Sequence, residues 1–181
     1  MLLERSLACL LIVDVQERLL PAMHEAERVE AKCRVLLCAA EQLNLPVLVS
    51  EQYPKGLGPT VKALASNQAM TFSKLSFSAL GAEEIRGQFL KLKQAGILQV
   101  IMCGIESHVC VLQSAADLRQ AGFDVYVVAD AVSSRSPESV ELALTRMRGF
   151  GVQVINTEMA LFELAGKAGT PEFKALSALI K

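Results

Sequence analysis

The sequence predicts an α/β protein in which a parallel sheet of six strands is covered by helices on both faces. Short apolar runs alternate along the whole chain with longer segments whose apolar residues recur every three or four positions. The 181 residues include 52% hydrophobic and 20% charged residues, enough apolar surface for the core of one ordinary domain. We therefore expect a single domain over residues 1–181.

The expected strands are short, continuous apolar runs, which are typical of strands buried on both faces of a sheet. They span residues 8–13, 46–50, 69–73, 99–103, 125–129 and 152–155. The first guess for their order is 3-2-1-4-5-6, that of a three-layer, Rossmann-like domain. In this order ligands bind beyond the carboxyl ends of the first and fourth strands, where the winding reverses.

The expected helices lie between and after these strands. They span residues 25–43, 83–94, 111–120, 136–150, 157–164 and 171–180. Pro137 falls in the first turn of its helix, and Gly96 and Gly122 follow the helices that they end. Residues 51–59 are rich in turn residues, so we expect an irregular loop there, with a short helix after Pro59.

Composition excludes several classes of function. The net charge of −1 gives no electrostatic case for a nucleic-acid partner. No window approaches the roughly 20 apolar residues of a membrane span, and the apolar run near the N-terminus lacks a signal-peptide cleavage site. Five cysteines without a CxxC pair indicate reduced thiols, so we expect a cytoplasmic protein.

The turn over residues 104–110 (GIESHVC) joins the fourth strand to the next helix. Cys110 is therefore expected near a helix N-terminus, where unpaired N–H groups and the helix dipole favour a thiolate and a developing oxyanion. The alternative at this point is that Cys110 is a small buried hydrophobe, as most free cysteines are.

Asp14 follows the first strand and Lys74 follows the third, so the predicted order brings both to the edge that carries Cys110. A thiolate can attack an acyl carbon, a carboxylate can take up its proton, and an ammonium can offset the accumulating negative charge. Taken singly, Asp14 could be a helix cap and Lys74 a solvated charge.

Other candidate sites have little support in the sequence. His108 lies only two residues before Cys110 and His24 lies in a polar stretch, so neither a Cys–His pair nor a metal site is indicated. No GxGxxG motif follows a strand, so we expect no dinucleotide and no other cofactor. The four remaining cysteines lie on apolar faces and are expected in the core: Cys9, Cys33, Cys38 and Cys103.

Four stretches resemble the isochorismatase-like cysteine hydrolases, which include nicotinamidases and the ureidoacrylate and N-carbamoyl amidohydrolases. They are residues 11–16 (LIVDVQ), 74–80 (KLSFSAL), 104–110 (GIESHVC) and 130–135 (DAVSSR). They follow the family's order and spacing over most of the chain. The loop over residues 51–58 (EQYPKGLG) is similar to the isochorismatase-domain-containing subgroup.

The resemblance implies a catalytic triad of Cys110 as nucleophile, Asp14 as general base and Lys74 as supporting cation. It also implies a cis peptide bond between Ile105 and Glu106, and an oxyanion hole formed by the backbone N–H groups of Glu106 and Cys110. It further implies the 3-2-1-4-5-6 sheet and a homo-oligomer, for which we expect contacts from the helices after the fifth strand or from the C-terminal helix.

Two departures from the family pattern narrow the expected function. Metal-binding nicotinamidases carry an Asp and several His where this chain has Glu51, Gln52 and Tyr53, so we expect no metal. Isochorismatase itself lacks the nucleophilic cysteine, so Cys110 argues against isochorismate as substrate.

The leading hypothesis is a hydrolase of a small amide, ureido or related acyl compound, acting on a non-peptide C–N bond through a covalent Cys110 adduct. The substrate-binding residues are expected to include Gln16, Leu19, Tyr53, Phe77 and Ser107. One alternative is a binding or scaffold protein of the same fold that performs no chemistry. A weaker alternative is a thiol redox protein that uses Cys110.

Overall fold

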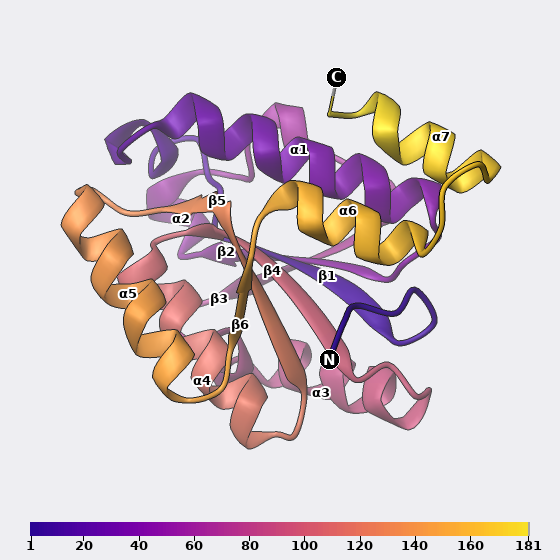
Figure 1. Ribbon diagram of the computed structural model, residues 1–181. Helices are drawn as coiled ribbons and strands as arrows, with labels where there is room; N and C mark the ends of the chain where they lie inside the picture. The colour runs from indigo at the N-terminus through magenta and orange to yellow at the C-terminus, as the bar shows by residue number, and fades with distance from the viewer. Residues whose placement is uncertain (181) are drawn as a thin grey trace.

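The computed structural model describes residues 1–180, and its sheet of six parallel strands lies between two layers of helices (Figure 1). The strands are β1 (Ala8–Val13), β2 (Val47–Gln52), β3 (Ala69–Lys74), β4 (Gln99–Ile105), β5 (Asp124–Ser133) and β6 (Gln153–Ile155). Their order, β3-β2-β1-β4-β5-β6, and their parallel pairing confirm the predicted sheet.

Two sets of helices cover the two faces of the sheet (Figure 1). One face carries α1 (Ala26–Gln42), α6 (Thr157–Ala165) and α7 (Pro171–Ala178), and the other carries α3 (Glu83–Gln94), α4 (Leu112–Gln120) and α5 (Pro137–Gly149). Side chains of a strand alternate between the faces. In β1, Leu10 and Ile12 therefore join the core under α1, whereas Leu11 and Val13 join the core under α3 and α4. Among the described residues, no helix is long and apolar enough to cross a membrane.

Five segments differ from the sequence expectation. Strands β2 and β4 run to Gln52 and Ile105, each two residues beyond the expected end, so residues 51 and 52 lie in a strand and not in the loop. Strand β5 continues to Ser133 instead of ending at residue 129, because its last residues pair with the end of β4 beyond an irregularity in the register. The turn Ser107–Val111 is π-helical and precedes α4. The loop after β2 contains a short helix of its own, α2 (Pro54–Leu57), and the turn expected after Pro59 is a 3-10 turn at Lys62–Leu64.

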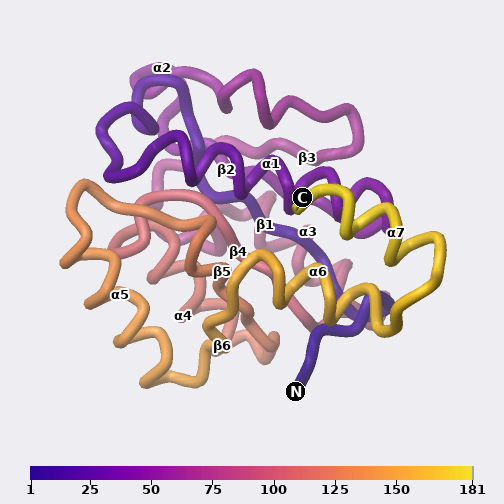
Figure 2. Tube along the Cα trace, turned by 45° about the horizontal axis from the view of Figure 1, so that its top comes forward, coloured from indigo at the N-terminus to yellow at the C-terminus, as the bar shows by residue number. Residues whose placement is uncertain are grey.

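The carboxyl ends of β1, β3 and β4 meet at one edge of the sheet. Figure 2 shows α2 and the indigo segment that follows β1 together at this end, away from the N-terminus. Gly104 allows the ends of β1 and β4 to approach each other: its φ is +112°, and a Cβ there would lie 2.1 Å from the carbonyl oxygen of Val13. No other residue type fits this position without moving a strand.

Candidate active site

Asp14 lies directly after β1 and is fully buried, with a φ of +52°. Ser50, near the end of the neighbouring β2, donates a hydrogen bond from Oγ to Asp14 Oδ1 at 2.7 Å. Lys74 Nζ donates to Asp14 Oδ2 at 2.7 Å. Both carboxylate oxygens therefore face partners in the sheet edge, and Asp14 is not a helix cap.

Lys74 ends β3, and its side chain is completely buried. Besides Asp14, its ammonium donates to Gln52 Oε1 at 2.7 Å, to the carbonyl of Phe77 at 3.0 Å and to that of Ser76 at 3.2 Å. A buried charge requires such partners. Lys74 is therefore not a solvated charge but half of a buried ion pair.

Cys110 lies in the π-helical turn before α4, and only 5% of its surface is exposed. Burial and, next, the Asp14 carboxylate raise the pKa of the Cys110 thiol to about 12, while the Lys74 ammonium lowers it. Both charges thus act on the thiol. The sequence favoured a thiolate at the helix N-terminus, but desolvation and the neighbouring carboxylate outweigh that effect, so the resting group is a thiol.

The turn that carries Cys110 is held from both sides. The Ile105–Glu106 peptide bond is cis. The carbonyl oxygen of Glu106 accepts hydrogen bonds from the N–H groups of Val109 and Val111, and its carboxylate pairs with Arg135 Nε at 3.2 Å. His108 Nδ1 contacts Ser134 Oγ at 2.9 Å, so its ring is held by the residue that follows β5.

The expected substrate contacts fall into two groups. Tyr53 and Phe77 are exposed by 52% and 54%, on the segments that follow β2 and β3. Leu75, which the sequence analysis did not single out, is exposed by 76% beside them. Gln16 and Leu19 are instead buried, Gln16 among backbone groups and Leu19 in the core beneath α1.

Ser107 is also fully buried, and its hydroxyl is the one buried side-chain polar atom in residues 1–180 without a hydrogen-bond partner. Such groups are few in folded proteins and call for an explanation. Ser107 lies in the same turn as Cys110, three residues before it. The position is consistent with a hydroxyl whose partner arrives with a substrate.

Sequence reasoning missed two polar partners of the Asp14–Lys74 pair, Ser50 and Gln52. They occupy alternate positions at the end of β2, so their side chains point to one face of the sheet. The predicted strand ends at Ser50, and Gln52 falls in the loop expected after it. The alternation that continues from Ser50 to Gln52 is the available signal. Of the other cysteines, Cys9, Cys33 and Cys103 are buried in the core as expected, and Cys38 is partly exposed.

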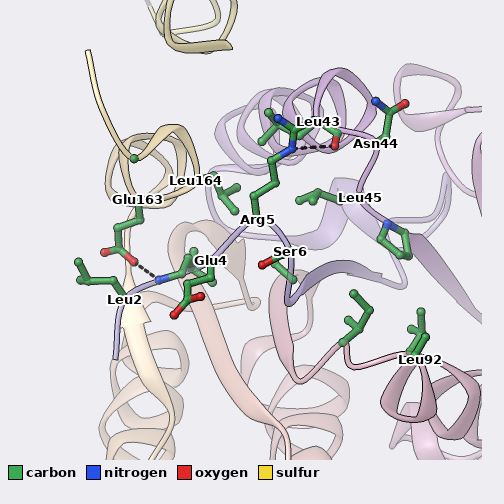
Figure 3. A pocket seen from close by; sticks show the side chains of 16 residues that line it. Leu2, Glu4, Arg5, Ser6, Leu43, Asn44, Leu45, Leu92, Glu163 and Leu164 are labelled. Atoms are coloured by element: carbon green, nitrogen blue, oxygen red, sulfur yellow. Dashed lines mark hydrogen bonds between the residues drawn. The ribbon is translucent and has the colours of Figure 1, made fainter. Parts of the chain in front are cut away.

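A separate cavity of about 970 Å³ lies at the opposite, amino edge of the sheet (Figure 3). Its lining is largely apolar, and polar side chains near it hold the N-terminal segment. Glu163 Oε2 accepts from the N–H of Leu3 at 2.8 Å, and Arg5 Nε donates to the carbonyl of Leu43 at 3.2 Å.

Within residues 1–180, no three or more His, Cys, Asp or Glu side chains gather in a way that could hold a metal ion.

Fold and site together define a class of protein: a doubly wound α/β protein with a thiol, a carboxylate and a lysine at the carboxyl edge of its sheet. A family model described as Isochorismatase domain matches residues 8–159. Isochorismatase domain-containing protein 2 of Danio rerio is 41% identical over 172 residues, 94% of this chain and 85% of that protein. The secreted isochorismatase effector Isc1 of Phytophthora sojae is 40% identical over 177 residues, 95% and 83% of the two chains. The chain belongs to the isochorismatase family.

Solved structures agree with this assignment. The MAR1 ribonuclease of Caenorhabditis elegans has a TM-score of 0.91 at 35% identity, covering 99% of this chain and 92% of that one. The YcaC gene product of Escherichia coli, an octameric hydrolase of unknown specificity, has a TM-score of 0.90 at 26% identity, covering 99% and 89%. YcaC of Pseudomonas aeruginosa, solved with hexane-2,5-diol and covalent acrylamide, has a TM-score of 0.85 at 29% identity, covering 98% and 91%.

Proposed function

We propose that this chain is a cysteine hydrolase that cleaves a non-peptide C–N bond in a small amide, ureido or related acyl compound through a covalent adduct on Cys110. The observation that carries the proposal is the buried Asp14–Lys74 ion pair acting on the thiol of a nearly buried cysteine. A thiol with a perturbed pKa beside a buried ion pair at the switch point of an α/β sheet is typical of an active site.

In the proposed reaction Asp14 takes the proton of the Cys110 thiol as the sulfur attacks the acyl carbon. The N–H groups of Glu106 and Cys110 stabilise the oxyanion that forms. The tetrahedral intermediate collapses to a thioester or thiocarbamate as Asp14 returns the proton to the departing nitrogen. Water, deprotonated by Asp14, then attacks the adduct and displaces the Cys110 sulfur, Asp14 returns the proton to that sulfur, and the product acid leaves. Lys74 limits the build-up of negative charge throughout.

The raised pKa of the Cys110 thiol supports this role for Asp14. A resting thiol needs a base at the moment of attack. The nearby Asp14 carboxylate, which accepts a hydrogen bond from the Lys74 ammonium, can take up the thiol proton and later return it. The covalent acrylamide in the Pseudomonas aeruginosa relative supports the presence of a nucleophilic side chain in this fold, because acrylamide reacts with nucleophiles at its carbon–carbon double bond.

We assign substrate contacts to three of the expected residues. The hydroxyl of Ser107 would hydrogen-bond a polar atom of the substrate, because it has no partner within the described chain. Tyr53 and Phe77 would contact the substrate at the entrance, because both are exposed at the carboxyl edge. The proposed substrate is therefore small, with an apolar part outside the acyl group.

A homo-oligomer is part of the same proposal. Met159 and Phe162 on α6 are exposed by 45% and 42%, and Phe162 lies 5.8 Å from the ring of Phe173 on α7. Exposed apolar side chains clustered in this way are typical of protein contacts. The octameric Escherichia coli relative supports assembly in this fold.

The test is a panel of small amides and ureides together with single-stranded RNA, read by product formation and by intact mass. We expect an amide or ureide to be hydrolysed and an acyl adduct to map to Cys110. Cys110→Ala and Asp14→Asn should each abolish turnover, and Cys38→Ala, at a partly exposed cysteine outside the triad, should not. RNA cleavage that survives Cys110→Ala would overturn the proposal in favour of a ribonuclease activity, which is the activity that the name of the Caenorhabditis elegans relative gives. An inert, unlabelled Cys110 would favour the scaffold alternative.

A further inference from the structure

The side-chain amide of Gln52 lies between Lys74 and the segment that follows β3. Its Oε1 accepts from Lys74 Nζ at 2.7 Å, and its Nε2 donates to the carbonyl of Leu75 at 2.8 Å. Gln52 and Lys74 are register partners in the parallel pairing of β2 and β3, so their side chains stand side by side on one face. The amide therefore contacts the ammonium on one side and the backbone of the segment that follows β3 on the other.

This orientation of the amide is the favourable one. An ammonium has three donors and no acceptor, and a carbonyl only accepts. Turning the amide over would set its NH₂ group against Lys74 Nζ and its oxygen against the carbonyl of Leu75. The hydrogen-bond network thus fixes the oxygen of Gln52 on the ammonium.

Gln16 holds the backbone of Gln52 in turn. The fully buried amide of Gln16 donates from Nε2 to the carbonyls of Gln52 at 3.0 Å and Gly58 at 2.7 Å, and its Oε1 accepts from the N–H of Gln52 at 2.8 Å. Both protons of its NH₂ group are used. Gln16 therefore ties the end of β2 and the end of α2 to the segment that follows Asp14.

We propose that Gln52 is a positioning residue that keeps the Lys74 ammonium against Asp14 and Cys110, and that Gln16 holds Gln52 in place. The proposal rests on the proposed cysteine-hydrolase function and assigns Gln16 a role other than substrate contact. Gln52 offers the ammonium an oxygen that carries no net charge. It therefore holds Lys74 without adding a second carboxylate beside the sulfur, where a negative charge would oppose the thiolate.

Lys74 is the charge that favours the Cys110 thiolate, whereas burial and Asp14 oppose it. An ammonium that moves away from the sulfur stabilises the thiolate less. Loss of the Gln52 oxygen leaves Lys74 with Asp14 and two longer contacts, to the carbonyls of Phe77 and Ser76. The reactivity of Cys110 at fixed pH therefore reports the position of Lys74.

The experiment measures the rate of acrylamide addition to Cys110 in the full chain by intact mass and peptide mapping, between about pH 7 and pH 9. The thiolate adds to the terminal carbon of the double bond, and the neighbouring carbon takes a proton from water. The variants are Gln52→Met, which keeps the volume and removes the polar atoms, and Gln52→Glu, which places a carboxylate there. Gln94→Ala, at an exposed glutamine on α3, is the matched control.

We expect Gln52→Met to react several-fold more slowly than wild type at every pH, since one pKa unit changes the thiolate fraction about tenfold. Gln52→Glu should react more slowly still, because it adds negative charge, and Gln94→Ala should match wild type. Rates are normalised to folded protein by near-UV circular dichroism. A purely structural role would lower the melting temperature and leave the normalised rate and its pH dependence unchanged.

Wild-type rates in both Gln52 variants would overturn the inference while leaving the proposed function intact. A Gln52→Glu rate at or above that of wild type would also overturn it, and this isosteric variant decides the matter if Gln52→Met does not fold. If Cys110 of the wild-type protein does not react at all, the proposed function fails instead, and the inference fails with it.

Discussion

Removing Lys74 should destabilise the protein far more than removing an ordinary surface charge. Both side chains of the Asp14–Lys74 pair are fully buried, and the charged atoms are 2.7 Å apart. Lys74→Met leaves the Asp14 carboxylate buried with only Ser50 as a side-chain partner. Breaking a buried pair from one side costs about 3–5 kcal/mol of unfolding free energy. Asp14→Asn leaves the ammonium uncompensated and should cost a similar amount.

The double variant, Asp14→Asn with Lys74→Met, carries no unpaired charge and should be no less stable than either single variant. The coupling free energy is then at least about 3 kcal/mol, at or above the upper end of the range for contacting residues. Urea unfolding at pH 7, analysed for midpoint and slope, measures all four proteins. Asp124→Asn, which removes a partly exposed 2.8 Å pair with Arg119 near the surface, should cost at most about 1 kcal/mol. Additive losses, or a Lys74→Met variant within about 1 kcal/mol of wild type, would refute the reasoning.

Three further predictions follow from single positions. Gly104→Ala should lose at least about 3 kcal/mol of unfolding free energy in the same assay. The φ of +112° at this position strains any residue with a side chain, and the alanine Cβ would meet the backbone of Val13. A loss below about 1 kcal/mol would contradict this. Ser107→Ala should leave the urea midpoint nearly unchanged but raise KM, because the hydroxyl has no partner within the described chain. Ser114→Ala, which removes a buried hydroxyl that accepts a hydrogen bond, should cost about 1–3 kcal/mol of unfolding free energy. The reverse pattern would argue against a substrate contact at Ser107. Acrylamide addition to Cys110 should rise about tenfold per pH unit between about pH 7 and pH 9, because these values lie below the raised pKa of about 12; a plateau in this range would contradict a resting thiol.

The sheet and the convergence of Asp14, Lys74 and Cys110 at its edge could be predicted because both depend on local patterns. Six apolar runs and the helices between them determine an α/β sheet. Asp14 directly follows β1, Lys74 ends β3, and Cys110 lies in the turn after β4. Once the strand order is known, their convergence needs no further information. The four motif stretches supplied the roles that the strand pattern alone left open.

What could not be predicted depends on contacts between segments far apart in the sequence. The extension of β5 to Ser133 arises from pairing with β4 beyond an irregular register, which no local pattern encodes. The amide of Gln16 donates hydrogen bonds to backbone carbonyls of β2 and of the loop after α2. We therefore assign Gln16 a positioning role in place of the expected substrate contact. The state of Cys110 depends on burial and on the Asp14 carboxylate, and these outweigh the helix-terminus effect that the sequence suggests.

The covalent adduct on Cys110 is the central claim, and mass spectrometry of the enzyme during turnover tests it most directly. With an amide or ureide that the wild-type protein hydrolyses, rapid acid quenching should yield protein carrying the acyl group, mapped to the peptide that contains Cys110. Asp14→Asn should accumulate this adduct if acylation continues slowly, because the residue that activates the hydrolytic water is gone. Cys110→Ala should show neither adduct nor turnover. Near-full turnover by Cys110→Ala, together with its loss in Asp14→Asn, would mean acid–base chemistry without a covalent step and would contradict the account.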